Sequence, residues 1–375
     1  MIDVISEPIP VQIVLVNGWI FQKMAAKLAE FLPKYGFSTR IGRNPSHDVA
    51  INHWMECLDY RSGEYPHISL YITHIDYWSK LYVLRRFMRK ASLGICMSSM
   101  MVDELSEAGI DRRKLCFILA GHDAELSPRR IRIGLATRLY SDGRKRESIL
   151  VDLARAMSLE DFEFSITGSG WEKVIPELEA AGAKVDYLDV SLNMDESRRN
   201  YYEQIKSLDY YLYTGLDEGS MGIFDAMAAG IPCILTPQGF HLDVPYAMSH
   251  TFLDSSELRS IFSEISRPRR NRVDAVSSMT WEKFAANHAR VWRAMLASPG
   301  CDFSALLPPT APDGIGLIKR DRRVRLLCNG NPEGDSWREI FYRIYRAHTG
   351  NNIFDTPAAN VLRSIKRVIF RRRLQ

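Results

Sequence analysis

Residues 209–240 read DYYLYTGLDEGSMGIFDAMAAGIPCILTPQGF, and this segment decides the fold class of the chain. Two short apolar runs, each typical of a buried strand, enclose a glycine-rich turn and a helical stretch of small residues. A strand that leads through a helix into a second strand is the building unit of a parallel sheet. The free N–H groups and the dipole at the start of such a helix attract an anion, most often a phosphate.

Acidic residues flank this turn. Asp225 falls in the first turn of the predicted helix, and Asp217 lies eight positions earlier in the loop. Side chains in the first turn of a helix lean towards its N-terminus, so both carboxylates can face one bound ligand. Carboxylates accept hydrogen bonds from sugar hydroxyls, and the segment therefore favours a nucleotide-sugar site. The alternative is that these acids, together with Glu218, only stabilise a helix N-terminus.

The same alternation of strands and helices fills the chain on both sides of a short basic linker at 127–130. Strands are predicted at 11–16, 67–73, 93–97, 115–119, 131–136, 162–167, 184–188, 210–213 and 233–235. Helices are predicted after the first strand as far as residue 31, and at 77–89, 98–108, 148–157, 171–181, 197–208, 222–229 and 281–296. The pattern predicts an α/β fold with two Rossmann-like domains facing a cleft, followed by a C-terminal helical extension. The predicted domains are 1–126, 127–298 and 299–375.

Composition agrees with a soluble globular chain of 375 residues, long enough for two domains. The six cysteines are scattered without CxxC spacing, which indicates a reducing compartment and argues against a zinc site. The N-terminus lacks a secretory signal pattern and no apolar run is long enough to span a bilayer, so we expect a cytoplasmic protein.

The basic charge is concentrated at the C-terminus. The net charge of +4 includes six basic residues within 363–373, without which the rest of the chain is acidic by two charges. Val361, Ile365, Val368 and Ile369 fall at helical spacing beside them. This terminal helix is a solvated end, a nucleic-acid patch or an interfacial helix, and its apolar stripe favours an anionic membrane surface. Nucleic acid is not an expected partner, because aromatic platforms and a basic body are missing.

Residues 131–296 resemble the donor-binding half of family 4 retaining glycosyltransferases with the GT-B fold. Two glutamates separated by seven residues, then a run like AMAxGxP, form the motif of that family. Asp217 and Asp225 occupy the acidic positions without a gap, whereas deletion of one residue matches Glu218 and Gly219 to the Glu-Gly pair; both alignments stay open. The likeness is loose over the first half of the chain and absent beyond residue 298.

The resemblance implies a retaining, metal-independent transfer of sugar from a nucleoside diphosphate to a hydroxyl of a glycan or lipid-linked acceptor. No cofactor is implied, and cell-surface polysaccharide assembly, such as capsule or lipopolysaccharide, is the implied setting. Asp225 would hold the ribose hydroxyls and Asp217 or Glu218 the transferred sugar, while Arg138 and Lys145 would hold the diphosphate. The implied backbone contacts come from Gly219, Ser220, Met221 and Gly222. His74, Asn17 and Gly18 would face the reacting centre from the first domain.

Three features depart from the family pattern. Both acids are aspartates in the ungapped alignment, the loop after the first strand is Asn17-Gly18 in place of a glycine pair, and the C-terminal extension has no counterpart. Two other functions stay open for the same fold. One is a nucleotide-sugar epimerase or hydrolase, and the other is a catalytically silent, membrane-associated module that binds sugar nucleotides.

Overall fold

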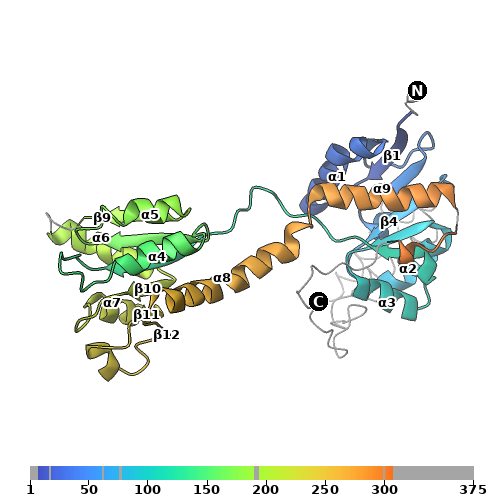
Figure 1. The fold of residues 1–375 in the computed structure, drawn as a ribbon. Helices are drawn as coiled ribbons and strands as arrows, with labels where there is room; N and C mark the ends of the chain where they lie inside the picture. Colours follow the sequence, from blue (N-terminus) through green and yellow to red (C-terminus); the bar gives the residue numbers. More distant parts are fainter. Residues whose placement is uncertain are drawn as a thin grey trace, which may run out of the picture. The chain divides into compact units, whose positions relative to one another are not determined.

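The structure is a computed structural model that describes residues 7–16, 18–60, 63–75, 78–189, 194–298 and 300–306. The chain divides into two compact units, which we call unit 1 (Met1–Leu126 with Ala275–Gln375) and unit 2 (Ser127–Asp274). Their relative placement is not determined, so each unit is described by itself (Figure 1).

Unit 1 contains a six-stranded parallel sheet with the strand order β2-β1-β3-β4-β5-β6. The strands are β1 (Ile9–Val14), β2 (Phe37–Gly42), β3 (Ile51–Trp54), β4 (Ile68–Ile72), β5 (Leu93–Cys96) and β6 (Leu115–Phe117). The α-helices are α1 (Trp19–Phe31), α2 (Trp78–Lys90), α3 (Ser99–Glu107) and α9 (Trp281–Ala297). Short 3₁₀ turns complete the unit: η1 (Leu32–Tyr35), η2 (Cys57–Asp59), η3 (Arg112–Lys114) and η5 (Phe303–Ala305).

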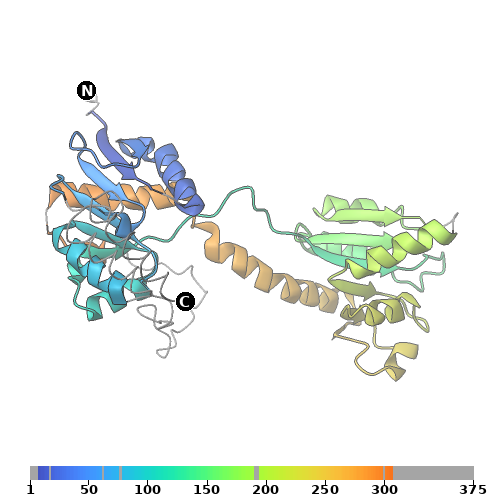
Figure 2. The same ribbon diagram turned by 180° about the vertical axis from the view of Figure 1, so that it is seen from behind.

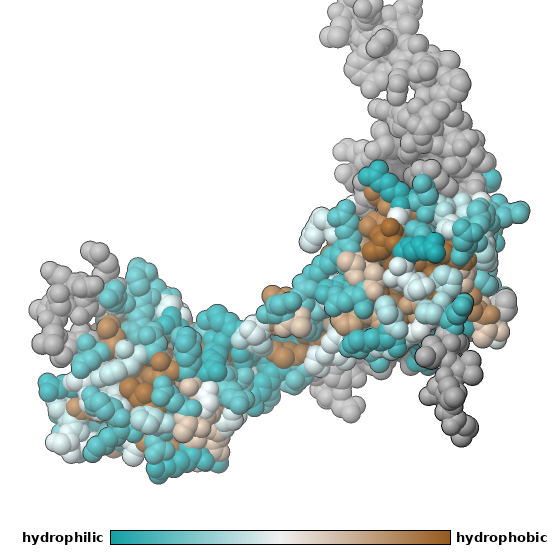
Figure 3. Space-filling model, turned by 90° about the horizontal axis from the view of Figure 1, so that it is seen from above, coloured by the Kyte–Doolittle hydropathy of each residue, from teal (hydrophilic) through white to brown (hydrophobic). Residues whose placement is uncertain are grey.

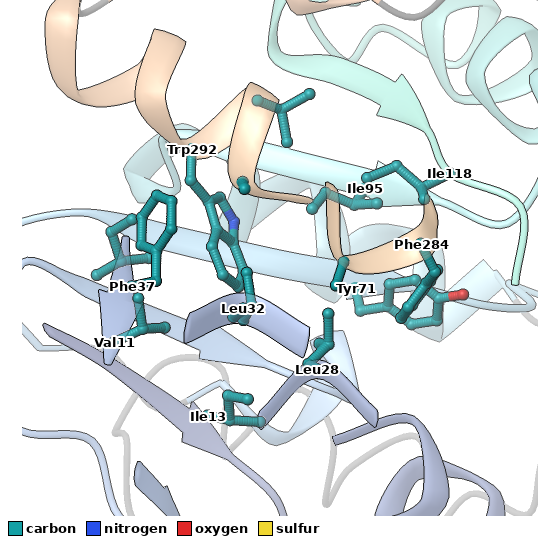
Figure 4. Close-up of a cluster of buried hydrophobic side chains, with 14 of the residues drawn as sticks. Val11, Ile13, Leu28, Leu32, Phe37, Tyr71, Ile95, Ile118, Phe284 and Trp292 are labelled. Carbon is teal, nitrogen blue, oxygen red and sulfur yellow. The ribbon is translucent and has the colours of Figure 1, made fainter. Parts of the chain in front are cut away.

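Each face of this sheet has its own hydrophobic core. One core joins the sheet to α2 and α3. The other joins it to α1 and α9, with Trp292 and Phe284 of α9 fully or almost fully buried against sheet residues such as Tyr71 (Figure 4). Burial of large aromatic side chains gives the strongest hydrophobic contribution per residue. Helix α9 is therefore an integral part of unit 1.

This packing corrects the predicted domain boundary at residue 298. The sequence placed the helix at 281–296 in the second domain, but the compact unit ends at Asp274 and α9 packs on the sheet of unit 1. An amphipathic pattern indicates that a helix buries one face, but it does not indicate against which sheet that face packs. Within the predicted extension, Phe303 is buried in the same core, whereas the C-terminal basic helix lies outside the described residues.

Unit 2 contains a second six-stranded parallel sheet with the order β12-β11-β10-β7-β8-β9. The strands are β7 (Ile131–Ala136), β8 (Phe162–Thr167), β9 (Lys184–Leu188), β10 (Tyr210–Tyr213), β11 (Cys233–Leu235) and β12 (His250–Thr251). The helices are α4 (Ser148–Ala156), α5 (Ile175–Ala180), α6 (Met194–Lys206), α7 (Gly222–Ala228), α8 (Ser255–Ser277) and the 3₁₀ turn η4 (Phe240–Asp243). Helices α4, α5 and α8 share one core with the sheet, and α6 and α7 share another. Figure 2 shows the ribbon of this unit from behind, with its sheet in green to olive.

The order of the strands reverses direction between β7 and β10. From β7 the chain proceeds outward through β8 and β9, and it then returns to the other side of β7 to add β10, β11 and β12. In open α/β sheets, ligands bind beyond the carboxyl ends of the strands at such a reversal point. The loops after β7 and β10 therefore mark the first place to look for a site in unit 2.

The predicted α/β class with two parallel, Rossmann-like sheets is confirmed, and this is the architecture of a GT-B fold. The predicted cleft between the domains stays a prediction. Within the described part of the chain, no helix combines the length and apolar character needed to cross a membrane. On the face drawn in Figure 3, hydrophobic patches are separated by hydrophilic residues.

Candidate functional site

A buried lysine joins the loops after β7 and β10. The ammonium of Lys145 lies 2.6 Å from Asp217 Oδ2 and donates to the Tyr213 hydroxyl, also at 2.6 Å. Tyr213 in turn donates to Asp217 Oδ1. Lys145 is only 7% exposed. The three side chains, which we call the Lys145 trio, thus form a closed hydrogen-bonded ring at the point where the strand order reverses.

The charge of Asp217 is stabilised despite its burial. Partial burial by itself would raise the pKa of the carboxyl, but donors from Lys145, Tyr213 and the Gly219 amide outweigh it, and the pKa falls below its ordinary value. Burial, together with the bond to Asp217, raises the pKa of Tyr213, so the phenol stays protonated and can donate. An ionised carboxylate facing a buried ammonium is the stable state of the trio.

Backbone bonds fix Lys145 beside the end of β10. The Thr214 hydroxyl donates to the Lys145 carbonyl at 2.5 Å, and the Leu216 amide donates to the Arg144 carbonyl at 2.7 Å. The two loops therefore run together, although about seventy residues separate them. This pairing explains how a lysine distant in sequence meets Asp217.

The loop that carries Asp217 rests on the segment after β11. The Gln238 side chain donates to the Asp217 carbonyl at 3.1 Å, and the Phe240 amide donates to the Glu218 carbonyl at 2.9 Å. Gly239 has φ 81° and ψ −167°, and a Cβ there would come within 2.4 Å of the Glu218 oxygen. Only glycine adopts this conformation readily, so its absence of a side chain permits the close contact.

Ser220 fixes the start of α7. Its hydroxyl donates to the Ala136 carbonyl at 2.9 Å and accepts from the Gly222 amide at 3.3 Å. The amides of Ser220 and Met221 have no acceptor among the described residues. Two donors are thus left free next to the trio, as expected for a turn that meets an anion.

Asp225 lies in the first turn of α7, as predicted. Its Oδ2 accepts from the Tyr201 hydroxyl of α6 at 2.8 Å, and burial with this bond raises the pKa of the phenol. The contact fixes one carboxylate oxygen of Asp225. No contact within the described residues joins Asp225 to Asp217, so their expected convergence on one ligand stays a prediction.

Arg138 and Glu218 are exposed at the same edge of the sheet. Arg138 comes two residues after β7, and its guanidinium lies 5.7 Å from the centre of the Tyr140 ring. Arg144 lies over the same ring at 4.1 Å and pairs with Asp142. The structure brings Lys145, Asp217, Gly219 and Ser220 into contact with one another or with the two strand ends, and leaves Arg138 and Glu218 beside them.

Arg146 holds three strand ends together, a role that the sequence did not reveal. It donates to the Thr214 carbonyl at 2.9 Å, the Leu253 carbonyl at 2.7 Å and the Thr236 hydroxyl at 3.1 Å. These oxygens follow β10, β12 and β11. Burial lowers the pKa of the guanidinium, and its φ of 48° is unusual for a residue other than glycine. The only sequence signal for it is a third basic residue in the run at 144–146.

The remaining candidates lie in unit 1. Gly18 precedes α1 with φ 104°, which favours glycine, and Asn17 lies outside the described residues. His74 is exposed two residues after β4. Glu56, after β3, is close enough for His74 to lower its pKa, although burial is the larger effect and leaves that pKa raised. Both residues lie at the carboxyl edge of the unit 1 sheet.

Metal-ligating side chains are not clustered in the described part of the chain, where no group of three His, Cys, Asp or Glu residues has suitable geometry. The site is defined instead by fixed cations, carboxylates and backbone amides. Such groups bind phosphates and sugar hydroxyls.

No family model matches the chain, and no curated protein matches it. Among solved structures, it is similar to Anabaena Alr3699/HepE in complex with UDP and glucose, at 14% identity over 76% of this chain and 95% of that chain, with a TM-score of 0.28. The lipopolysaccharide outer core galactosyltransferase WaaB in its apo form is also 14% identical, over 76% and 99%, with a TM-score of 0.29. A putative UDP-N-acetylglucosamine 2-epimerase from Listeria monocytogenes is 8% identical, over 80% and 100%, with a TM-score of 0.25. Likeness at this level does not carry function, which follows from the chemistry of the site.

Proposed function

We propose that the protein is a glycosyltransferase that takes a sugar from a nucleoside diphosphate donor bound at the carboxyl edge of unit 2. The observation that carries the proposal is the buried Lys145, ion-paired with Asp217 at the reversal point between β7 and β10. Buried charges are maintained where they have a partner, and a perturbed charged cluster at a ligand-binding edge indicates function.

The groups around this lysine suit the two halves of a donor. Lys145 and the exposed Arg138 supply positive charge for a diphosphate, and the free amides of Ser220 and Met221 supply neutral donors. Negative charge accumulates on the diphosphate as the bond to the sugar breaks. Fixed cations and amides stabilise that charge without rearranging.

Carboxylates would bind the hydroxyl groups of the donor's ribose and of its transferred sugar. One oxygen of Asp225 is held by the Tyr201 hydroxyl, and in this proposal Asp225 binds the ribose. Asp217 is engaged by Lys145 and Tyr213, whereas the side chain of Glu218 is exposed. These different environments favour Glu218 as the direct contact of the transferred sugar and Asp217 as the partner that fixes Lys145.

The acceptor, the retention of configuration and a role in polysaccharide assembly rest on the family resemblance. We include all three in the proposal, with a hydroxyl of a glycan or of a lipid-linked glycan as the acceptor. His74 and Gly18 are assigned to the reaction from the same resemblance, and both lie at the carboxyl edge of the unit 1 sheet. A cytoplasmic, peripheral membrane location depends on the terminal basic helix and stays a prediction.

Measurements of donor binding test the proposal in two steps. A thermal-shift screen over UDP-, GDP-, ADP- and CMP-sugars identifies the donor, because a ligand that binds the folded state raises its melting temperature. Calorimetry then compares Arg138→Gln with Arg144→Gln, its neighbour over the same Tyr140 ring. Loss of a charged hydrogen bond predicts about tenfold weaker binding for Arg138→Gln and for Asp225→Asn, with little change for Arg144→Gln.

Two results would reject this assignment. One is a lack of stabilisation by every sugar nucleotide, and the other is unchanged donor affinity in both Arg138→Gln and Asp225→Asn. Donor consumption without any acceptor would instead indicate a hydrolase, if the nucleoside diphosphate is released, or an epimerase, if the donor is converted into a second sugar nucleotide.

A further inference from the structure

We propose that Tyr213 is a positioning residue, whose hydroxyl sets the Lys145 ammonium and the Asp217 carboxylate so that one lysine N–H is presented to the donor diphosphate. This inference rests on the proposed function. It extends that function to a residue which the sequence marks only as part of an apolar strand.

The hydroxyl of Tyr213 is used in both directions. It accepts from Lys145 Nζ at 2.6 Å and donates its single hydrogen to Asp217 Oδ1. Lys145 bonds to the other carboxylate oxygen, Oδ2, at 2.6 Å. Oδ1 also accepts from the Gly219 amide at 3.2 Å. Because Tyr213 and Gly219 together use both acceptor positions of Oδ1, the ammonium binds Asp217 through Oδ2 alone.

One donor of the lysine is left over. An ammonium has three N–H groups, and in Lys145 one is directed to Tyr213 and one to Asp217. No acceptor for the third occurs among the described residues. Because the side chain is only 8% exposed, little water reaches this donor, and a buried donor without an acceptor is costly. A phosphate oxygen at the reversal point would satisfy it and add attraction between charges.

Without the Tyr213 hydroxyl the ammonium would lose the bond that opposes the pull of Asp217. It would then move towards both carboxylate oxygens, and the free N–H would turn away from the ligand. Asp217 would also lose one of the three donors that keep its pKa below the ordinary value. A change at Tyr213 therefore affects both the strength of donor binding and its dependence on pH.

A matched control lies on the same strand. Tyr211 precedes Tyr213 by two residues, so it occupies the same face of β10, and both side chains are buried in the same core. The Tyr211 hydroxyl lies 3.3 Å from the Ala136 carbonyl and from Ser220 Oγ, and it makes no contact with the Lys145 trio. Without this hydroxyl, Ser220 keeps its bonds to the Ala136 carbonyl and the Gly222 amide, which hold the start of α7. Tyr211→Phe removes a buried hydroxyl from the strand without removing the proposed positioning contact.

The experiment compares the full-length protein with Tyr213→Phe and Tyr211→Phe. For each, the dissociation constant of the donor found in the screen is measured by calorimetry from pH 4 to pH 8, with the melting temperature at each pH. We expect about tenfold weaker binding for Tyr213→Phe at pH 7. As the pH is lowered, Tyr213→Phe should lose donor binding at a higher pH than the unsubstituted protein does. Tyr211→Phe should retain the affinity and pH profile of the unsubstituted protein.

The outcomes separate this inference from the function on which it rests. Donor binding by the unsubstituted protein, with the same affinity and pH profile in Tyr213→Phe, overturns the positioning role alone. The same loss in Tyr211→Phe as in Tyr213→Phe also overturns it, because the effect would then come from weakening the strand. Absence of donor binding by the unsubstituted protein refutes the proposed function and this inference with it.

Discussion

The buried histidine His288 makes the stability of unit 1 depend on pH. This residue of α9 is fully buried among the rings of Phe284, Tyr71 and Trp292. Its Nδ1 donates to the Phe284 carbonyl at 2.8 Å, and Nε2 has no partner among the described residues. A second proton would therefore place an unpaired charge in the core. The perturbation that tests this is acidification.

The size of this loss of stability follows from the pKa of the His288 imidazole. Burial, only partly offset by the bond to Phe284, lowers the pKa of His288 from 6.5 to about 4. Between these values the unfolded chain binds more protons than the folded one, so stability rises with pH. The contribution is fully present above pH 6.5 and is lost as the pH falls towards 4. The difference between the pKa values of His288 in the unfolded and the folded chain corresponds to about 3 kcal/mol of unfolding free energy.

Urea unfolding at pH 7, 6, 5 and 4, followed by tryptophan fluorescence, measures this loss. In His288→Phe the fall in unfolding free energy from pH 7 to pH 4 should be smaller by about 3 kcal/mol than in the unsubstituted protein. His47→Phe, at an exposed histidine, controls for removal of an imidazole. An unchanged pH dependence in His288→Phe would show that this histidine is not held neutral by burial.

Two further predictions concern the support of the site. Gly239→Ala should abolish measurable donor binding and lower the melting temperature, because its Cβ would meet the Glu218 carbonyl at 2.4 Å. Gly143→Ala, also at positive φ but with open space around it, is the control, and equal effects of the two would contradict a steric role for position 239. Arg146→Lys should lower the unfolding free energy by about 2 kcal/mol in urea titrations, since one ammonium cannot reach the oxygens of Thr214, Thr236 and Leu253 together. Arg144→Lys should be nearly neutral at its exposed position, and a similar loss there would count against the proposed link between strand ends.

Much of unit 2 is predictable from its sequence because most of its strands are short apolar runs with a glycine near one end. The predicted strands at 131–136, 162–167, 184–188, 210–213 and 233–235 coincide with β7 to β11. By contrast, β3 was missed because its sequence, INHW, places Asn52 and His53 in a buried strand. Asn52 is satisfied by the backbone of Ser46, and His53 Nδ1 pairs with the Ser69 hydroxyl, whereas His53 Nε2 has no partner among the described residues. Only the fold supplies these partners.

Helix α8 was missed for a different reason. Pro268 lies inside it, and proline normally ends a helical pattern. Leu258, Ile261 and Phe262 are nevertheless buried in the core of unit 2, so tertiary packing stabilises a helix whose local propensity is poor.

The candidate site was predictable at the level of loops and less so at the level of contacts. Asp225 lies in the first turn of α7 as the pattern indicated, and Lys145, which the resemblance assigned to the diphosphate, lies beside Asp217. Hydropathy cannot distinguish Tyr213 from its neighbours in YYLY, because its role depends on a hydroxyl that meets a lysine 68 positions away. Long-range polar contacts of this kind leave no periodic signal.

The place of α9 has a consequence for synthesis of the protein on the ribosome. The first 126 residues form a sheet that lacks the covering helix until residues 281–297 have been translated. Unit 2 is continuous in sequence and contains its own cores, so it can fold while the nascent chain still holds the earlier sheet half-covered. The second unit to be translated is thus the first that can be completed, and the N-terminal sheet is the surface that needs protection from aggregation during translation.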